Sequence, residues 1–198
     1  MKIGDLINVA TGERKYLDAR EREAFKKAAA FAPPDARTVA MLIFYTGCRI
    51  GEALELTPDR LDYDHGRVIL RTFKQHRGQK VKPDKFRYVE LPETFMAGLE
   101  SQYKARSRRG TKTGSKPLWP FTIRTAQKYI KAIMTDAGID GRRATARGLR
   151  HSMGVNLALH KTPIHLIADI LGHESLSSTR IYMEILGDDR RDVIAAVW

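Results

Sequence analysis

The spacing of apolar residues along the chain changes twice, and these changes predict its secondary structure. Up to residue 57 the apolar positions recur at three- and four-residue intervals, as in helices packed on one face. Residues 67–73 and 85–91 are instead short runs rich in β-branched and aromatic side chains, which predict two strands. After residue 92 the helical interval returns. We therefore expect a mainly α fold with one small antiparallel β-sheet.

Capping and turn residues predict where the helices begin and end. Asp18, with Glu21 three residues later, forms a capping-box pattern at a helix start. Asp35 is expected to cap a second, buried helix that Gly47 interrupts, and Gly172 suits the position just after a helix end. Besides the helix that Asp35 is expected to cap, the expected helices are residues 19–31, 49–56, 93–106, 122–137, 147–160, 163–171, 175–184 and 188–198.

Composition and charge restrict the possible functions. The chain has 198 residues, enough for one large domain or for one domain with a short arm. Its 35 Lys and Arg against 23 Asp and Glu give a net charge of +12, which favours a polyanionic partner. The sequence contains no apolar run of about 18 residues, the length that a membrane-spanning helix needs. The single cysteine, Cys48, excludes an internal disulfide and favours a cytoplasmic protein.

The excess positive charge is concentrated in two segments. Residues 101–150 contain 13 Lys and Arg against two acidic residues, a local net charge of +11. Residues 71–88 contain seven against one. A single basic run is often only a solvated surface. Two such runs, each beside a motif described below, favour a surface that faces double-stranded DNA.

Residues 171–182 contain the most informative motif. Cleavage of a phosphodiester without metal or water requires a nucleophile, cations that neutralise the non-bridging oxygens, and an acid for the leaving 5′ oxygen. Tyr182 follows His173 by nine residues, each at the end of an expected helix. A tyrosine in a cationic environment is a candidate nucleophile, and His173 a candidate donor to phosphate. Taken alone, a capping histidine and a packed tyrosine are the more common explanations.

Arginines and a lysine elsewhere in the chain are candidates for holding the phosphate. Arg49 lies in the first turn of an expected helix with Glu52 on the same face, although a structural Arg–Glu pair would have the same pattern. Arg147 and Arg150, three residues apart, also share a helix face. Lys74, just past the first strand, is a candidate acid, with Lys80, Lys82 and Lys85 as competitors. His151 is expected to be a core or supporting residue.

The order of these motifs resembles the tyrosine recombinase, or phage-integrase-like, family. The shared elements are a basic hairpin with a lysine, Arg-x-x-Arg-His, Leu-Gly-His and a tyrosine nine residues later, and the resemblance extends from residue 16 to residue 182. It implies a 3′-phosphotyrosyl intermediate formed without metal, nucleotide or other cofactor. The catalytic set it implies is Arg49, Lys74, Arg147, Arg150, His173 and Tyr182.

One position departs from the family pattern. The family usually has histidine where Arg147 stands, and an arginine is a poor general base because it stays protonated. The departure leaves open how Tyr182 loses its proton. We expect Arg147→Ala to cripple cleavage and Arg147→His to retain it.

The resemblance also implies an organisation for the chain. We expect a leader at residues 1–17, a catalytic domain at 18–184, and a C-terminal helix within 185–198 that docks on a neighbouring protomer of a DNA-bound tetramer. Family members usually carry a further N-terminal domain. The chain is therefore either a catalytic-domain fragment or, as we prefer, a short member similar to fimbrial-switch invertases. The alternatives are a type IB topoisomerase-like enzyme and an accessory DNA-binding protein that has lost catalysis.

Overall fold

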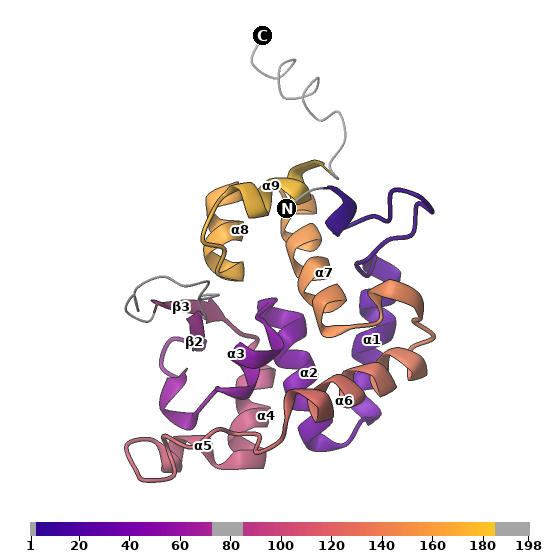
Figure 1. Cartoon of the computed structure of the whole chain (residues 1–198). Coiled ribbons are helices and arrows are strands. Elements are labelled where there is room, and N and C mark those ends of the chain that lie inside the picture. The colour runs from indigo at the N-terminus through magenta and orange to yellow at the C-terminus, as the bar shows by residue number, and fades with distance from the viewer. Residues whose placement is uncertain (1–2, 73–84, 185–198) are drawn as a thin grey trace.

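Helix α2 (Pro34–Thr46) is the central element of the fold. Its sequence is apolar on nearly every face, and such a helix is stable only when other elements surround it. The computed structural model, which describes residues 3–72 and 85–184, packs α1 (Ala19–Phe31), α6 (Ile123–Asp136) and α7 (Ala146–Leu159) around α2. Figure 1 shows α2 enclosed by these helices. This group contains most of the hydrophobic core.

A three-stranded antiparallel sheet covers one side of the helices. Its strands are β1 (Leu61–Asp62), β2 (Arg67–Thr72) and β3 (Lys85–Glu90), in the order β1-β2-β3. The short helix α3 (Ile50–Leu54) packs on β2, and α8 (Ile164–Leu171) packs on β3 (Figure 1). The sheet therefore joins the α3 region to the C-terminal helices.

A second, smaller apolar cluster joins α7, α8 and α9 (Ser177–Met183). Its buried members are Leu6, Val155, Ala158, Ile167, Leu171, Ile181 and Tyr182. Leu6 comes from the N-terminal segment, which begins with the 3-10 helix η1 (Ile3–Asp5) and lies beside α7 in Figure 1. Tyr182 is thus held in the apolar cluster by side chains from both ends of the described chain.

Two helices and two 3-10 turns complete the described fold. Helices α4 (Glu93–Tyr103) and α5 (Ala105–Arg108) follow the sheet. The 3-10 turns η2 (Pro58–Arg60) and η3 (Gly141–Arg143) precede β1 and α7. No helix in residues 3–72 or 85–184 is long and apolar enough to cross a membrane.

The mainly α fold with a small antiparallel sheet is confirmed, and so are several local predictions. Both halves of the capping box between Asp18 and Glu21 form. Gly172 ends α8 with a φ of 66°, a left-handed conformation that glycine adopts without steric cost.

One local prediction is wrong, and one strand was not predicted. Asp35 does not cap α2, because Pro33 occupies that position, and the Asp35 carboxylate instead accepts a hydrogen bond of 2.7 Å from the Tyr103 hydroxyl. Strand β1 was not expected, since two residues are too short to show a period. The predicted helix at residues 188–198 lies outside the described residues.

Candidate active site

A cleft of about 520 Å³ opens between the starts of α3 and α7 and the segment that joins α8 to α9. It contains four of the residues predicted from the sequence, and Tyr182 lies against its wall. Lys74 lies outside the described residues. The residues that line the cleft are Cys48, Arg49, Ile50, Ala146, Arg147, Arg150, His151, His173 and Ser178.

Arg49 occupies the N-cap position of α3. Gly47, with a φ of 62°, ends α2 and turns the chain so that α3 starts at the cleft. The Arg49 guanidinium donates a 2.8 Å hydrogen bond to the Glu52 carboxylate, as the sequence spacing predicted. Its side chain remains 41% exposed, so it can reach a ligand in the cleft.

The same carboxylate binds a second arginine, which is not among the residues predicted from the sequence. Glu52 has a fully buried side chain, and Nη2 of Arg87 lies 2.7 Å from its Oε2 atom. Burial alone would raise the pKa of Glu52, but the adjacent Arg87 and the hydrogen bonds from Arg87 and Arg49 lower it. Glu52 is therefore ionised, and it fixes Arg49 at the edge of the cleft.

Arg87 also makes two other hydrogen bonds. It donates from Nε to the Ile170 carbonyl at 2.9 Å and from Nη1 to the Thr72 hydroxyl at 2.8 Å. The sequence signal for a buried Arg87 is its position two residues before Val89 in β3, because residues two apart in a strand face the same side of the sheet. A charged residue at an inward position requires a buried partner, and that partner is Glu52.

Arg150 projects from α7 into the cleft and is only 7% exposed. Its Nη1 atom donates to the Gly47 carbonyl at 2.8 Å, which directs the guanidinium toward the start of α3. Burial, together with the nearby charge of Arg49, lowers the pKa of Arg150 to about 10. The side chain remains charged at neutral pH. Two neighbouring cations in a cleft favour binding of an anion.

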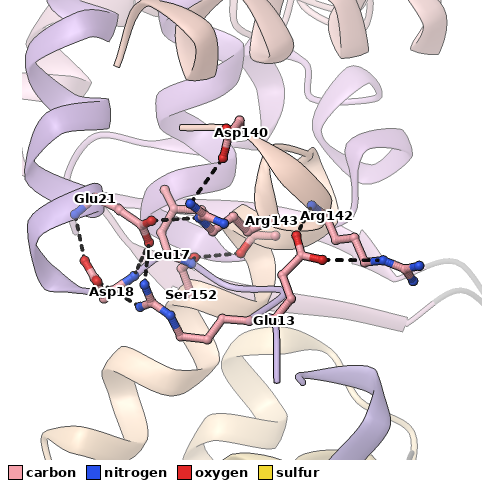
Figure 2. Close-up of polar contacts among 10 residues, drawn as sticks. Glu13, Leu17, Asp18, Glu21, Asp140, Arg142, Arg143 and Ser152 are labelled. Carbon is pink, nitrogen blue, oxygen red and sulfur yellow. Dashed lines mark hydrogen bonds and ion pairs between the residues drawn. The ribbon is translucent and has the colours of Figure 1, made fainter. Parts of the chain in front are cut away.

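A network of polar contacts, drawn in Figure 2, fixes the start of α7. This helix carries Arg147, Arg150 and His151. The Ser152 hydroxyl accepts a hydrogen bond from the Leu17 N–H at 2.7 Å and donates to the Gly148 carbonyl. Just before α7, the Arg143 guanidinium lies 2.7 Å from the Glu21 carboxylate of α1. The N-terminal segment and α1 thereby position the helix that forms one wall of the cleft.

His173 follows the left-handed Gly172 at the end of α8. Its Nδ1 atom lies 2.7 Å from the Thr179 hydroxyl, which orients the ring between α8 and α9. Burial, then the charges of Arg150 and Arg49, lower the pKa of His173 to about 3. In the free protein the ring is therefore neutral, with one N–H to donate.

Tyr182, on α9, is fully buried behind the two histidines. Its ring stacks on that of His173, with ring centroids 6.1 Å apart and an interplanar angle of 8°, and its Oη lies 3.1 Å from Nδ1 of His151. Burial raises the pKa of Tyr182 to about 12, against the opposing effects of Arg150 and Arg147. Because the ring is fully buried, its oxygen can reach a phosphate in the cleft only after a local rearrangement.

Arg147 lies at the mouth of the cleft and is 63% exposed. It shares the cleft with Arg150 but has different partners. Its Nε donates to Nε2 of His151 at 3.1 Å, and its Nη2 lies 3.2 Å from the Asp5 carboxylate. Among residues 3–72 and 85–184, no group of three or more His, Cys, Asp or Glu lies close enough to hold a metal ion.

Comparison with known proteins identifies the family. The model of the phage integrase family matches residues 15–187. The chain belongs to the phage integrase family. This integrase-family chain is 29% identical over 183 residues to the tyrosine recombinase XerA of Thermococcus kodakarensis, with 87% of the chain and 60% of XerA covered. It is 28% identical over 175 residues to the type 1 fimbriae regulatory protein FimE of Escherichia coli K12, covering 86% of the chain and 85% of FimE.

Solved structures show the same fold. A crystal structure of XerA recombinase has a TM-score of 0.70 at 25% identity, covering 91% of this integrase-family chain and 64% of XerA. The catalytic domain of bacteriophage HP1 integrase has a TM-score of 0.66 at 18% identity, with 92% and 95% covered. XerH recombinase bound to its difH substrate has a TM-score of 0.69 at 24% identity, with 85% and 50% covered. The chain thus spans between half and nearly all of the lengths of these proteins.

Proposed function

We propose that the chain is the catalytic part of a site-specific DNA recombinase that cleaves and rejoins DNA through a bond between Tyr182 and a 3′ phosphate. One observation carries the proposal. The guanidinium groups of Arg49 and Arg150 and the His173 ring line a single cleft, and the Tyr182 phenol packs against the wall of that cleft. Family membership and the similarity to XerA and FimE support it.

The two arginines hold the scissile phosphate in this proposal. Arginine presents paired N–H donors that match phosphate oxygens and keeps its charge in a partly buried site. Glu52 orients Arg49, and the Gly47 carbonyl orients Arg150, so both donors are in place before DNA arrives. Their charges stabilise the additional negative charge that develops in the transition state. His173 supplies a neutral N–H donor.

The chemical step exchanges one phosphoester for another. The Tyr182 Oη gives up its proton to solvent water and forms a bond to phosphorus as the bond from phosphorus to the 5′ oxygen breaks, and the 5′ oxygen takes up a proton from an acid. The sequence resemblance assigns that acid to Lys74. Attack by a 5′-hydroxyl from a second duplex reverses the step and releases Tyr182. The phosphotyrosyl ester preserves the energy of the broken phosphodiester bond, so rejoining the DNA needs no nucleotide.

Double-stranded DNA is the proposed substrate. A second cavity of about 670 Å³ shares Ile50, Ala146, Arg147 and His151 with the catalytic cleft. It extends to Lys131 on α6, whose exposed side also carries Arg124 and Lys128. A basic path of this kind suits a phosphate backbone that continues beyond the cleft. XerH, which has a similar fold, was solved bound to difH substrate, and the Tn1549 transposon integrase was solved in complex with transposon right end DNA.

The resemblance to the family supports a proposal for the assembly and for the division of the chain. We propose a homotetramer on DNA in which residues 185–198 dock on a neighbouring protomer. Residues 18–184 form the catalytic domain and residues 1–17 its N-terminal arm. Leu6 of that arm packs in the apolar cluster around Tyr182, so the arm supports the nucleophile as well as preceding the domain.

A nicked DNA duplex tests the proposed function. The probe is a set of duplexes made from the DNA that flanks the gene, each nicked so that the cleaved strand diffuses away and leaves the covalent adduct trapped. We expect the wild-type chain to form a protein–DNA adduct and Tyr182→Phe to form none while binding DNA normally. Tyr129→Phe, on α6 and outside the cleft, is the matched control and should retain the adduct. An adduct in Tyr182→Phe would reject the assignment.

A further inference from the structure

A chain of two hydrogen bonds connects Arg147 to the proposed nucleophile through His151. Nε of Arg147 lies 3.1 Å from Nε2 of His151, and Nδ1 of the same ring lies 3.1 Å from the Tyr182 Oη. His151 is only 2% exposed, yet its ring forms part of the cleft wall. It therefore lies between the proposed phosphate site and the phenol.

The Arg147 guanidinium determines the tautomer of His151. A guanidinium has only donors, so the His151 Nε2 must accept with its lone pair. In a neutral imidazole the proton is then on Nδ1. Nδ1–H consequently donates to the Tyr182 oxygen, which acts as the acceptor in this hydrogen bond. The proton of the Tyr182 phenol takes no part in this hydrogen bond.

We propose that His151 is the positioning residue for the nucleophile: its Nδ1–H donates to the Tyr182 oxygen and stabilises the phenolate, and Arg147 acts through His151 by fixing its tautomer. This inference rests on the proposed function of Tyr182. A hydrogen bond to the charged form of a group favours that form. The arrangement explains how an arginine can occupy the position where the family usually has histidine without itself accepting a proton.

His151 does not act as the base in this step, because its Nδ1 carries a proton and its Nε2 lone pair accepts from Arg147. Burial, then Arg147 and Arg150, lower the pKa of His151 to about 4, so the ring is a weak proton acceptor at neutral pH. The phenol proton passes to a solvent water once Tyr182 is exposed by the rearrangement that attack requires. The Oη then bonds to phosphorus, and the 5′ oxygen leaves with a proton from the proposed acid. His151 ends the step in the tautomer in which it began.

Two substitutions separate a donor from a residue that merely fills space. His151→Leu removes the donor but keeps an apolar side chain, whereas His151→Asn places an N–H₂ near the position of Nδ1. The measurement is the single-turnover rate of adduct formation on the nicked duplex, with DNA binding measured separately. We expect His151→Leu to slow the reaction about 10- to 100-fold with binding unchanged, and His151→Asn to recover most of the loss.

A more acidic phenol at residue 182 tests whether His151 stabilises the phenolate, because a purely structural role of His151 would not change how much the reaction gains from that acidity. Replacing Tyr182 with 3,5-difluorotyrosine lowers the intrinsic pKa of the nucleophile. If His151 stabilises the phenolate, this replacement should accelerate His151→Leu by a larger factor than it accelerates the wild-type chain. Arg147→Ala, a change at an exposed side chain, should show the same rescue, so the test does not depend on how well His151→Leu folds.

The outcomes distinguish this inference from the function on which it rests. Absence of an adduct from the wild-type chain would overturn both. A wild-type adduct, together with wild-type rates in His151→Leu and Arg147→Ala, would overturn the role of His151 alone. Equal acceleration of all three chains by difluorotyrosine would also overturn it.

Discussion

The Arg87 guanidinium of β3 lies 2.7 Å from the Glu52 carboxylate of α3, within the buried interior of the molecule. The other oxygen of the same carboxylate lies 2.8 Å from Arg49. Arg87 also donates to the Ile170 carbonyl at the end of α8, one turn before His173. One buried ion pair therefore joins the sheet, the arginine at the start of α3 and the helix that positions His173.

Glu52→Gln should destabilise the fold, because it leaves Arg87 with a buried and uncompensated charge. Removal of one partner from a buried ion pair costs about 3–5 kcal/mol, and urea denaturation measures the loss. Glu23→Gln, at an exposed pair with Lys26, is the matched control and should cost less than about 1 kcal/mol. Similar losses in the two variants would show that the Glu52 pair contributes nothing beyond a surface contact.

Gly154→Ala should slow cleavage through its effect on Tyr182. Gly154 lies on α7, and a methyl group there would overlap the Tyr182 ring, so the ring would have to shift from the position in which its Oη meets Nδ1 of His151. We expect adduct formation to fall at least about 10-fold while DNA binding persists. Gly98→Ala on α4, where an added methyl meets nothing within 4 Å, should stabilise the fold by about 0.5–1 kcal/mol and leave cleavage unchanged. Cleavage at the wild-type rate in Gly154→Ala would mean that the Tyr182 ring can leave this position at no cost.

Stability should decrease as the pH falls below about 6.5. His151 has a folded pKa of about 4, lowered by burial and then by Arg147 and Arg150, so the unfolded chain binds this proton first. The contribution of the neutral His151 ring to stability is complete above its pKa in the unfolded chain, about 6.5. This contribution is lost progressively as the pH falls toward 4. At pH 5 the loss from His151 is at most about 2 kcal/mol, and His173, whose folded pKa is about 3, adds a loss of similar size.

The urea midpoint at pH 7 and at pH 5 measures this loss. His151→Asn cannot be protonated, so its stability should depend less on pH over this interval. An equal dependence in the two proteins would show that other groups account for it.

Arg147→Ala should cripple cleavage, whereas Arg147→His should retain it. The alanine variant loses the donor that holds the His151 tautomer, while an imidazole at residue 147 can supply both a donor and a proton acceptor. Adduct formation on the nicked duplex at several pH values measures both variants. If neither change alters the rate, residue 147 does not act on the reaction.

The sequence predicted elements whose signals are local. The capping box of α1 and the glycine after α8 depend on a few neighbouring residues, so they could be predicted without tertiary information. Strand β1 could not be predicted, because two residues are too few to show a period. Asp35 does not cap α2, because the helix begins at Pro34 and its N-cap residue is Pro33. Spacing also placed Glu52 beside Arg49, since both lie in one helical turn.

The part of the site that depends on long-range packing could not be predicted. Arg87 contributes to the cleft through an ion pair with a residue 35 positions away, which no local pattern records. The sequence left His151 as a core or supporting residue, because its role depends on the contact with Tyr182, 31 residues later. Arg150 is buried where it donates to the Gly47 carbonyl, whereas Arg147, three residues before it, is exposed beside Asp5, and no local pattern separates the two.

The most direct test of the account is the identity of the atom that joins protein to DNA. The adduct trapped on the nicked duplex is digested with trypsin and nuclease, and the modified peptide is sequenced by mass spectrometry. We expect one nucleotide, linked through its 3′ phosphate, on the Tyr182 phenol. Attachment to any other residue, or through a 5′ phosphate, would contradict it.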